Sequence, residues 1–247
     1  MPLYECVNTR TRVSGANSYL RMGTSYGTSE SAIAISVKVA DKAGVPILQR
    51  VLKRIEFVIR DDAKRRNESV NYRGSVINLS LMTTASTLLG EDLKVAYKRG
   101  IVIVASAGNS DADACDVAPA KYKQVITVAS TDVGYSEGRS SNWGRCVTIS
   151  AAGVGIESAW IGRDDATKII TGTSQATARV AGFAATITSW EFSGAKTATP
   201  DHVLDRMKSN GNFYTLVGGG RSTNFLMNNG FWKGNPYSPY PGRQVPV

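Results

Sequence analysis

The sequence predicts an α/β fold in which helices cover both faces of a mainly parallel sheet. Short runs of β-branched and other apolar residues alternate with segments of helical periodicity along the middle of the chain. The apolar runs are continuous rather than alternating, as in strands that are buried on both faces. Strands and helices that alternate at this spacing favour a parallel, doubly covered sheet. At 247 residues the chain is long enough for one domain with a continuous core.

The first half of this pattern contains two expected strands and two expected helices. The first strand covers residues 31–39, and a helix begins near Pro46, where apolar residues start to recur at helical spacing. The second strand covers residues 75–81. The second helix runs from residue 87 to 99 and ends before Gly100, since glycine tolerates the positive φ that follows a helix.

The second half continues the alternation. A third strand is expected at residues 101–109, where it runs into a turn of small residues, and two shorter strands follow at 125–130 and 147–150. The next helix is rich in alanine, from residue 176 to 185, and a short helix follows from residue 199 to 208.

The two ends of the chain differ from the middle. Residues 1–24 show no clear period, so we expect an ill-defined lead-in without a strand or helix. The domain proper is expected over residues 25–230. Residues 231–247 hold four of the eight prolines, with aromatic residues between them, and predict a tail with little regular structure.

Charge and hydropathy limit the classes of partner. The chain has 29 Lys and Arg residues against 20 Asp and Glu residues, a formal net charge of +9. A basic helix face after Pro46 could bind a polyanion, or it could simply be a solvated outer face. No nucleic-acid motif accompanies the charge, so no nucleic-acid partner is expected. No apolar run is long enough to cross a membrane, and the N-terminus lacks the order of a signal peptide.

One short run carries the clearest chemical signal. A glycine and two hydroxyl residues lead directly into the alanine-rich helix, in the order Gly172-Thr173-Ser174. Ser174 would then lie at a helix N-terminus, where exposed N–H groups and the helix dipole favour a developing oxyanion. The alternative is that Ser174 only caps the helix.

The whole run resembles the serine block of the subtilisin-like proteases, Gly-Thr-Ser-Met-Ala-Thr-Pro-His-Val-Ala-Gly, and departs from it at Gln175, Ala178 and Arg179. Three further blocks between residues 25 and 229 are similar to the same family: the strand around Asn78, the turn Ala107-Gly108-Asn109, and Pro119-Ala120 with the strand at 125–132. The resemblance points to the proteinase K branch and implies a three-layer, doubly wound parallel sheet.

The resemblance also assigns roles to individual residues. It implies that Ser174 is the nucleophile and that the side chain of Asn109 donates to the oxyanion. It implies that the substrate is a protein or peptide, that the protein is extracellular, and that it acts as a monomer. The substrate-binding positions that it implies are Ser80, Leu81, Ser106, Ala107 and Gly108.

The rest of the family's catalytic machinery does not match. The family's Asp-Thr-Gly strand and His-Gly-Thr-His helix should precede residue 25, and residues 1–24 contain neither. The single histidine, His202, lies where the family has no catalytic residue. We therefore expect this chain to be inactive alone and expect the strands beside the missing aspartate strand to be unpaired.

Two readings explain this mismatch. The chain could be an N-terminally truncated protease that lacks the first strands of the family's fold. It could instead be a non-catalytic module that binds peptides, because Met82-Thr83-Thr84 replaces glycines of the family's substrate groove.

Cysteines and metal ligands complete the expectations. Cys115 and Cys146 fall where some proteinase K-like proteins have a disulfide, although two buried thiols would also fit; Cys6 is left without a partner. Thr148 stands where that branch has a carboxylate for calcium, so we expect neither a metal nor a cofactor.

Overall fold

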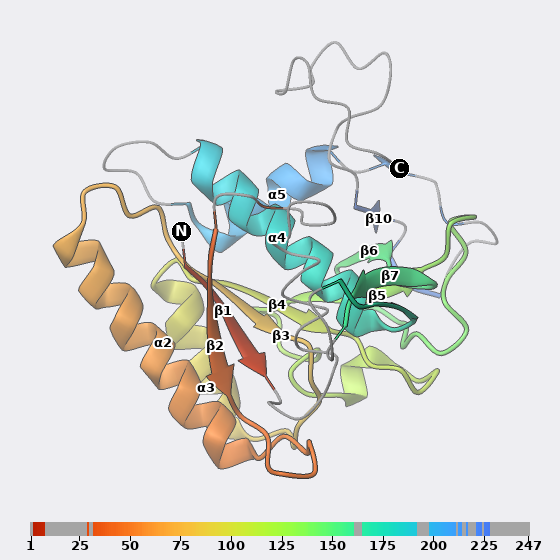
Figure 1. Cartoon of the computed structure of the whole chain (residues 1–247), viewed down its shortest axis with the longest axis horizontal. Coiled ribbons are helices and arrows are strands. Elements are labelled where there is room, and N and C mark those ends of the chain that lie inside the picture. Colours follow the sequence, from red (N-terminus) through yellow and green to blue (C-terminus); the bar gives the residue numbers. More distant parts are fainter. Residues whose placement is uncertain are drawn as a thin grey trace.

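An eight-stranded sheet between two layers of helices forms the centre of the molecule (Figure 1). The computed structural model describes residues 2–7, 29, 32–160, 165–191, 198–210, 212–213, 216, 221–223 and 225–227. The strand order is β2-β1-β3-β4-β5-β6-β10-β9, and every pair is parallel except β10 with β9. The strands are β1 (Pro2–Val7), β2 (Ile33–Lys38), β3 (Val76–Leu79), β4 (Val102–Ser106), β5 (Ile126–Thr131), β6 (Ile149–Ala152), β9 (Asn212–Phe213) and β10 (Phe225–Leu226).

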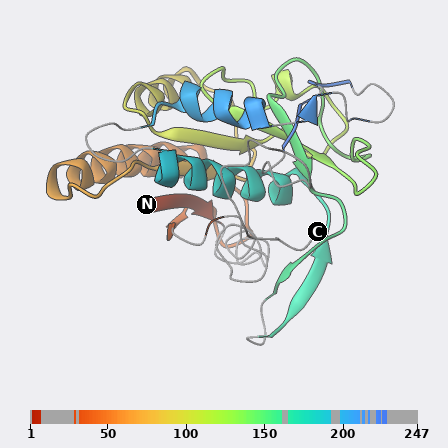
Figure 2. The same ribbon diagram turned by 90° about the horizontal axis from the view of Figure 1, so that it is seen from above.

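Each face of the sheet is covered by a pair of helices (Figures 1 and 2). On one face lie α2 (Leu48–Glu68) and α3 (Thr87–Lys98), which pack through Ile55 and Leu93. On the other face lie α4 (Thr173–Glu191) and α5 (Pro200–Asn210). The strands β3 and β4 are fully buried between them, which explains their continuous apolar sequences. The predicted fold class is confirmed.

Local sequence explains where α3 begins and ends. Ser86 has an extended backbone, and its hydroxyl accepts a hydrogen bond from the backbone N–H of Leu89 at 3.1 Å. This is the N-cap arrangement that satisfies one of the unpaired donors of a first helical turn. Gly100 follows the helix with a φ of +81°, which a residue with a Cβ rarely adopts.

The N-terminal segment differs from the sequence prediction. Residues 2–7, which were expected to have no regular structure, form β1 and pair in parallel with both β2 and β3. The expectation that neighbouring strands would be left unpaired is therefore wrong. The segment has little local strand signal, and its strand depends on hydrogen bonds from a neighbour on each side, which only the tertiary structure supplies.

Other elements also escaped the prediction. The strand expected at 147–150 lies two residues later, at β6. A two-stranded antiparallel ribbon of β7 (Ile156–Ala159) and β8 (Thr167–Ile170) projects from the body of the molecule (Figure 2). Most side chains of β8 are exposed, with Ile169 at 66%, whereas β7 is mostly half-buried. The ribbon therefore lacks the continuous apolar pattern of a strand that is buried on both faces. The tail expected at 231–247 lies outside the described residues.

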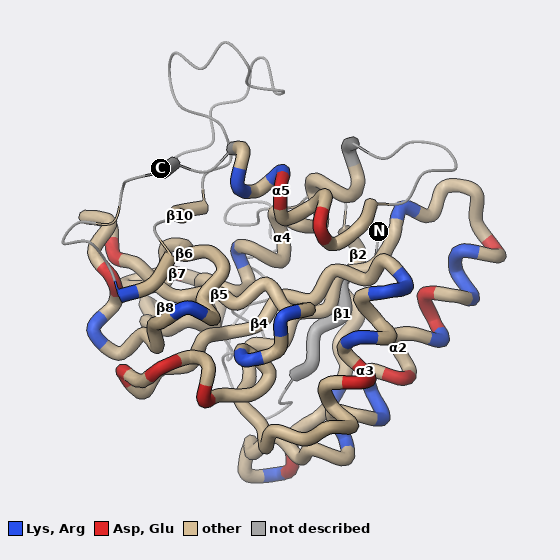
Figure 3. The backbone as a smooth tube through the Cα atoms, turned by 180° about the vertical axis from the view of Figure 1, so that it is seen from behind, with Lys and Arg blue, Asp and Glu red and all other residues tan. Residues whose placement is uncertain are grey.

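Basic residues of α2 alternate with acidic ones along the helix (Figure 3). Three of them pair with a carboxylate one turn away on the same helix, namely Arg65 with Asp61, Arg66 with Asp62, and Lys64 with Glu68. These pairs favour the reading of a solvated outer face over a binding site for a polyanion. None of the helices in the described ranges has the length and apolar character needed to cross a bilayer.

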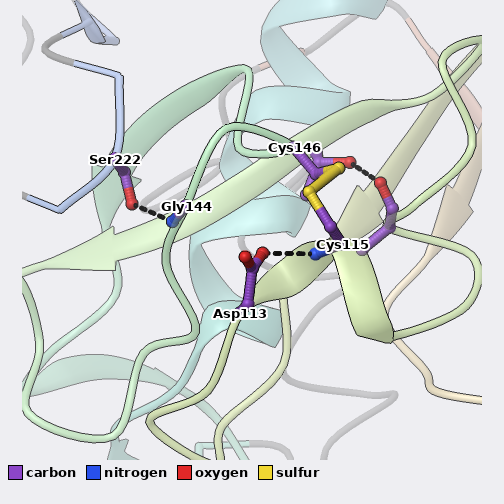
Figure 4. The surroundings of a disulfide bond; sticks show 7 residues. Asp113, Cys115, Gly144, Cys146 and Ser222 are labelled. Carbon is purple, nitrogen blue, oxygen red and sulfur yellow. Dashed lines mark hydrogen bonds between the residues drawn. A yellow bond between two sulfur atoms is a disulfide. The ribbon is translucent and has the colours of Figure 1, made fainter.

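A disulfide joins Cys115 to Cys146 and encloses a loop with a sequence separation of 31 residues (Figure 4). Asp113 accepts a hydrogen bond from the backbone N–H of Cys115, and Ser222 accepts one from the backbone N–H of Gly144. The disulfide therefore lies in a region where the segments before β5 and β6 meet the C-terminal part of the chain.

Removal of this disulfide should destabilise the protein. A loop of this length corresponds to about 3–4 kcal/mol on the chain-entropy model. We expect the double variant Cys115→Ser/Cys146→Ser to lose about that amount of unfolding free energy, as measured by urea denaturation. Addition of a reductant should shift the parent to the same midpoint and should leave the double variant unchanged. A parent that does not respond to reductant would contradict the assignment.

Candidate active site

The side chains singled out from the sequence meet at the carboxyl ends of β3 and β4, beside the N-terminus of α4. Asn78 is the third residue of β3 and Ser80 follows the strand, whereas the turn after β4 carries Asn109. In open parallel sheets the loops at this edge form the binding site because the strands all point toward it. Two segments that lie 64 positions apart in the chain, at Asn109 and Thr173, are thereby brought together.

Asn109 contacts the first residue of α4 through its carboxamide oxygen. Its Oδ1 accepts the backbone N–H of Thr173 at 2.8 Å and the Thr173 hydroxyl at 3.1 Å. The N–H of Thr173 would have no partner within the helix, so Asn109 acts as a cap supplied by a distant loop. Because Oδ1 is used in this way, Nδ2 is the end of the carboxamide that remains to donate outward. Asn109 itself is exposed.

Ser174 is the second residue of α4 and is half-buried. Its backbone carbonyl accepts a hydrogen bond from the Ser80 hydroxyl at 3.2 Å, and Ser80 in turn accepts one from Asn78 Nδ2 at 3.0 Å. Ser174 therefore lies at the N-terminus of α4, which is the positive end of the helix dipole.

Close backbone packing sets the position of the turn that precedes Ser174. The N–H of Gly172 donates to the carbonyl of Gly153 at 2.9 Å. A Cβ at Gly153 would lie 2.7 Å from the Gly172 oxygen and 2.7 Å from Ser130 Cβ, so only glycine fits. Gln175, which departs from the family's block, is buried with its Oε1 next to Gly172. The contact between Gly153 and Gly172 depends on the packing of two distant turns, so local sequence does not reveal it.

The positions expected to bind substrate are only partly accessible. Ser80 is half-buried beside Ser174, whereas the other four residues are buried: Leu81, Ser106, Ala107 and Gly108. Met82 is 45% exposed, and its sulfur would lie 3.1 Å from a Cβ on Gly108. Met82 therefore packs against the turn at Gly108.

His202 and Thr148 both make hydrogen bonds that belong to the secondary structure around them. His202 is exposed in the first turn of α5, and its backbone N–H donates to Thr199 Oγ1 at 3.2 Å. Thr148 Oγ1 accepts the backbone N–H of Thr127 at 3.1 Å and so links β5 to the start of β6. Within the described ranges, no cluster of three His, Cys, Asp or Glu side chains could hold a metal ion.

A charged cluster that the sequence did not reveal lies just beyond Asn109. Arg221 forms an ion pair with Asp111 at 2.7 Å, and its guanidinium stacks on Trp143 with 4.8 Å to the ring centroid. Trp143 also donates to Asp111 Oδ1 at 3.1 Å. The hydrogen bond from Arg221 is the main cause of the lowered pKa of Asp111.

This cluster predicts a measurable change in titration. Substitution Arg221→Gln should raise the pKa of Asp111 toward its ordinary value, because the main stabiliser of the carboxylate is lost. The stabilisation from this pair is present above the ordinary carboxyl pKa and is lost as the pH falls through the lower pKa of the folded protein. An NMR titration of the Asp111 carboxyl carbon measures the shift; an unchanged midpoint would show that the pair does not form in solution.

Comparison with known proteins places this geometry in a family. A family model described as the subtilase family matches residues 11–211. The chain is 39% identical over 186 residues to Subtilisin-like protease 3 of Pseudogymnoascus destructans, which is 75% of this chain and 45% of that protein. It is 35% identical over 158 residues to cerevisin of Saccharomyces cerevisiae, which is 64% of this chain and 25% of cerevisin. The chain thus spans less than half the length of these curated relatives.

The structural comparison agrees with the sequence comparison. A solved cold-adapted subtilisin-like serine proteinase superposes with a TM-score of 0.76 at 28% identity, covering 91% of this chain and 87% of that one. The family model covers well over half of the 247 residues, and the fold agrees independently. The chain therefore belongs to the subtilase family of subtilisin-like serine proteases.

Proposed function

We propose that the protein is a serine endopeptidase in which Ser174 attacks the peptide carbonyl and Asn109 Nδ2 donates to the resulting oxyanion. The observation that carries this proposal is the pair of hydrogen bonds from Thr173 to Asn109 Oδ1. These two hydrogen bonds hold the Asn109 carboxamide by its oxygen. Its nitrogen, Nδ2, would then be available to donate a hydrogen bond beside Ser174. A donor fixed in advance stabilises the transition state without a cost of reorganisation.

The proposed substrates are proteins or peptides, in line with the protease names of the relatives. The residues that would line the path of the substrate chain are Ser80, Leu81, Ser106, Ala107 and Gly108, and Met82 would narrow that path. An extracellular location is supported by the disulfide, since such bonds persist in oxidising compartments. We further propose that the protein acts as a monomer and without a nucleic-acid partner.

Catalysis requires a base that takes the proton of Ser174. His202 is exposed on α5 and is the single histidine of the 247 residues. We therefore propose that hydrolysis depends on a histidine and an aspartate outside this sequence and that the chain is inactive alone. The second candidate is a non-catalytic peptide-binding module, and the packing of Met82 against Gly108 favours it.

Chemical labelling of the native product, meaning the protein as it is isolated from its natural source, separates these two candidate functions. A fluorophosphonate reacts with an activated serine and should label Ser174 in a protease, and Ser174→Ala should abolish the label. The chain of 247 residues expressed alone should stay unlabelled, because it lacks the base. Absence of label in the native product, together with tight binding of peptides, would favour the binding module instead.

Variants of Asn109 test the oxyanion donor directly. Asn109→Asp keeps an acceptor for the Thr173 N–H but removes the donor, whereas Asn109→Leu removes both. In the native product we expect kcat to fall about 10²–10³-fold in both variants with little change in KM, the loss typical of one oxyanion-hole donor, subtilisin included. Only Asn109→Leu should also lower the melting temperature, because it leaves the helix donor without its cap. An unchanged kcat in Asn109→Asp would rule out the proposed role.

A further inference from the structure

The turn that presents Asn109 has a backbone shape that needs support from outside. It follows β4 and contains two residues in the left-handed region, Gly108 with a φ of +109° and Asp111 with a φ of +49°. Aspartate is one of the few non-glycine residues that adopt this region, and contacts with neighbouring segments help to hold it there. The turn also lacks the repeating hydrogen bonds of a helix or sheet, so its N–H and C=O groups need other partners.

Asn142, in the loop between β5 and β6, supplies those partners. Its backbone N–H donates to the Gly108 carbonyl at 2.9 Å, and its Nδ2 donates to the Ala107 carbonyl at 2.9 Å. Its Oδ1 accepts the backbone N–H of Ser110 at 2.8 Å and that of Ala112 at 3.2 Å. The hydrogen bonds of this one residue thus flank Asn109 on both sides along the chain.

The fit around Asn142 leaves little room for movement. Asn142 is completely buried, with an exposed fraction of 0%. A Cβ on Gly108 would lie only 2.4 Å from its Nδ2, so the carboxamide packs directly against the Cα that precedes Asn109. The carboxamide of Asn142 supplies a donor on one atom and an acceptor on another; aspartate lacks the donor and alanine lacks both.

We infer that Asn142 is a positioning residue that fixes the Asn109 carboxamide against the N-terminus of α4. It acts through the turn at 107–112, and Asn109 in turn holds the N–H of Thr173 at 2.8 Å. An effect of Asn142 on catalysis rests on the proposed function, in which Asn109 Nδ2 donates a hydrogen bond to the oxyanion. The positioning itself has a readout that needs no catalysis, which is the hydrogen exchange of the Thr173 amide.

The exchange experiment compares Asn142→Ala and Asn142→Asp with the parent. Rates at Thr173, Ser110 and Ala112 are normalised to that of Ile103 in β4, which reports global opening. In Asn142→Ala we expect all three amides to exchange at least tenfold faster. Asn142→Asp keeps the acceptors for Ser110 and Ala112 but places a carboxylate against the Ala107 carbonyl. Those two amides should therefore stay protected while Thr173 alone exchanges faster.

Leu93→Ala provides the matched control for loss of stability. Leu93 is fully buried in α3, on the opposite face of the sheet from α4. This variant should raise the exchange of all slow amides together and leave the normalised rate of Thr173 unchanged. The Asn142→Asp variant preserves side-chain volume and keeps the test decisive if Asn142→Ala does not fold.

Kinetics of the native product form the second arm. We expect both Asn142 variants to lower kcat tenfold or more with KM within twofold, and Leu93→Ala to leave both constants at parental values. A parental normalised exchange rate at Thr173 in both Asn142 variants would overturn the inference. A native product that hydrolyses no peptide would overturn the proposed function, and the exchange rate of Thr173 would still decide the role of Asn142.

Discussion

The hydrogen bond from the Thr173 N–H to Asn109 Oδ1 is the interaction on which the candidate site depends. It joins the turn after β4 to the first residue of α4, so it links Asn109 to the residue that precedes Ser174. The bond also satisfies a helix donor that would otherwise need water or a local cap. The same hydrogen bond therefore stabilises the N-terminus of α4 and fixes the position of Asn109 beside it.

The sheet makes this contact possible because it holds both elements at the same edge. The strand β4 lies in the middle of the sheet and is buried on both faces. Alanines on α4 let the helix approach the sheet closely, and the small residues Gly153 and Gly172 let the turn before Ser174 rest on the turn after β6. Such close backbone packing transmits displacements with little loss, since protein interiors have few voids to absorb them.

Around this centre the structure adds an outer shell drawn from distant parts of the chain. Asn142 supports the Asn109 turn from the β5–β6 loop, Arg221 contacts Asp111 from the C-terminal part, and the disulfide joins the flanking segments. The contribution of the Arg221 pair is modest because both side chains are about half exposed, at 47% and 54%. The buried hydrogen bonds of Asn142 are less screened, so they dominate the shape of the turn.

The sequence alone determined the alternation of strands and helices and the positions of β3, β4, α2 and α3. These features are local, since each depends on periodicity, a cap or a turn within a few residues. Ser174 and Asn109 were indicated by the resemblance of their motifs to those of a known family. The tertiary structure decided the features that depend on contacts between distant parts of the chain. It decided the placement of β1 between two partners, the exposed ribbon of β7 and β8, and the orientation of the Asn109 carboxamide. It also decided the role of Asn142, because its partners lie about 30 or more positions earlier in the chain. Such long-range hydrogen bonds leave no periodic trace in the sequence, so only the folded chain reveals them.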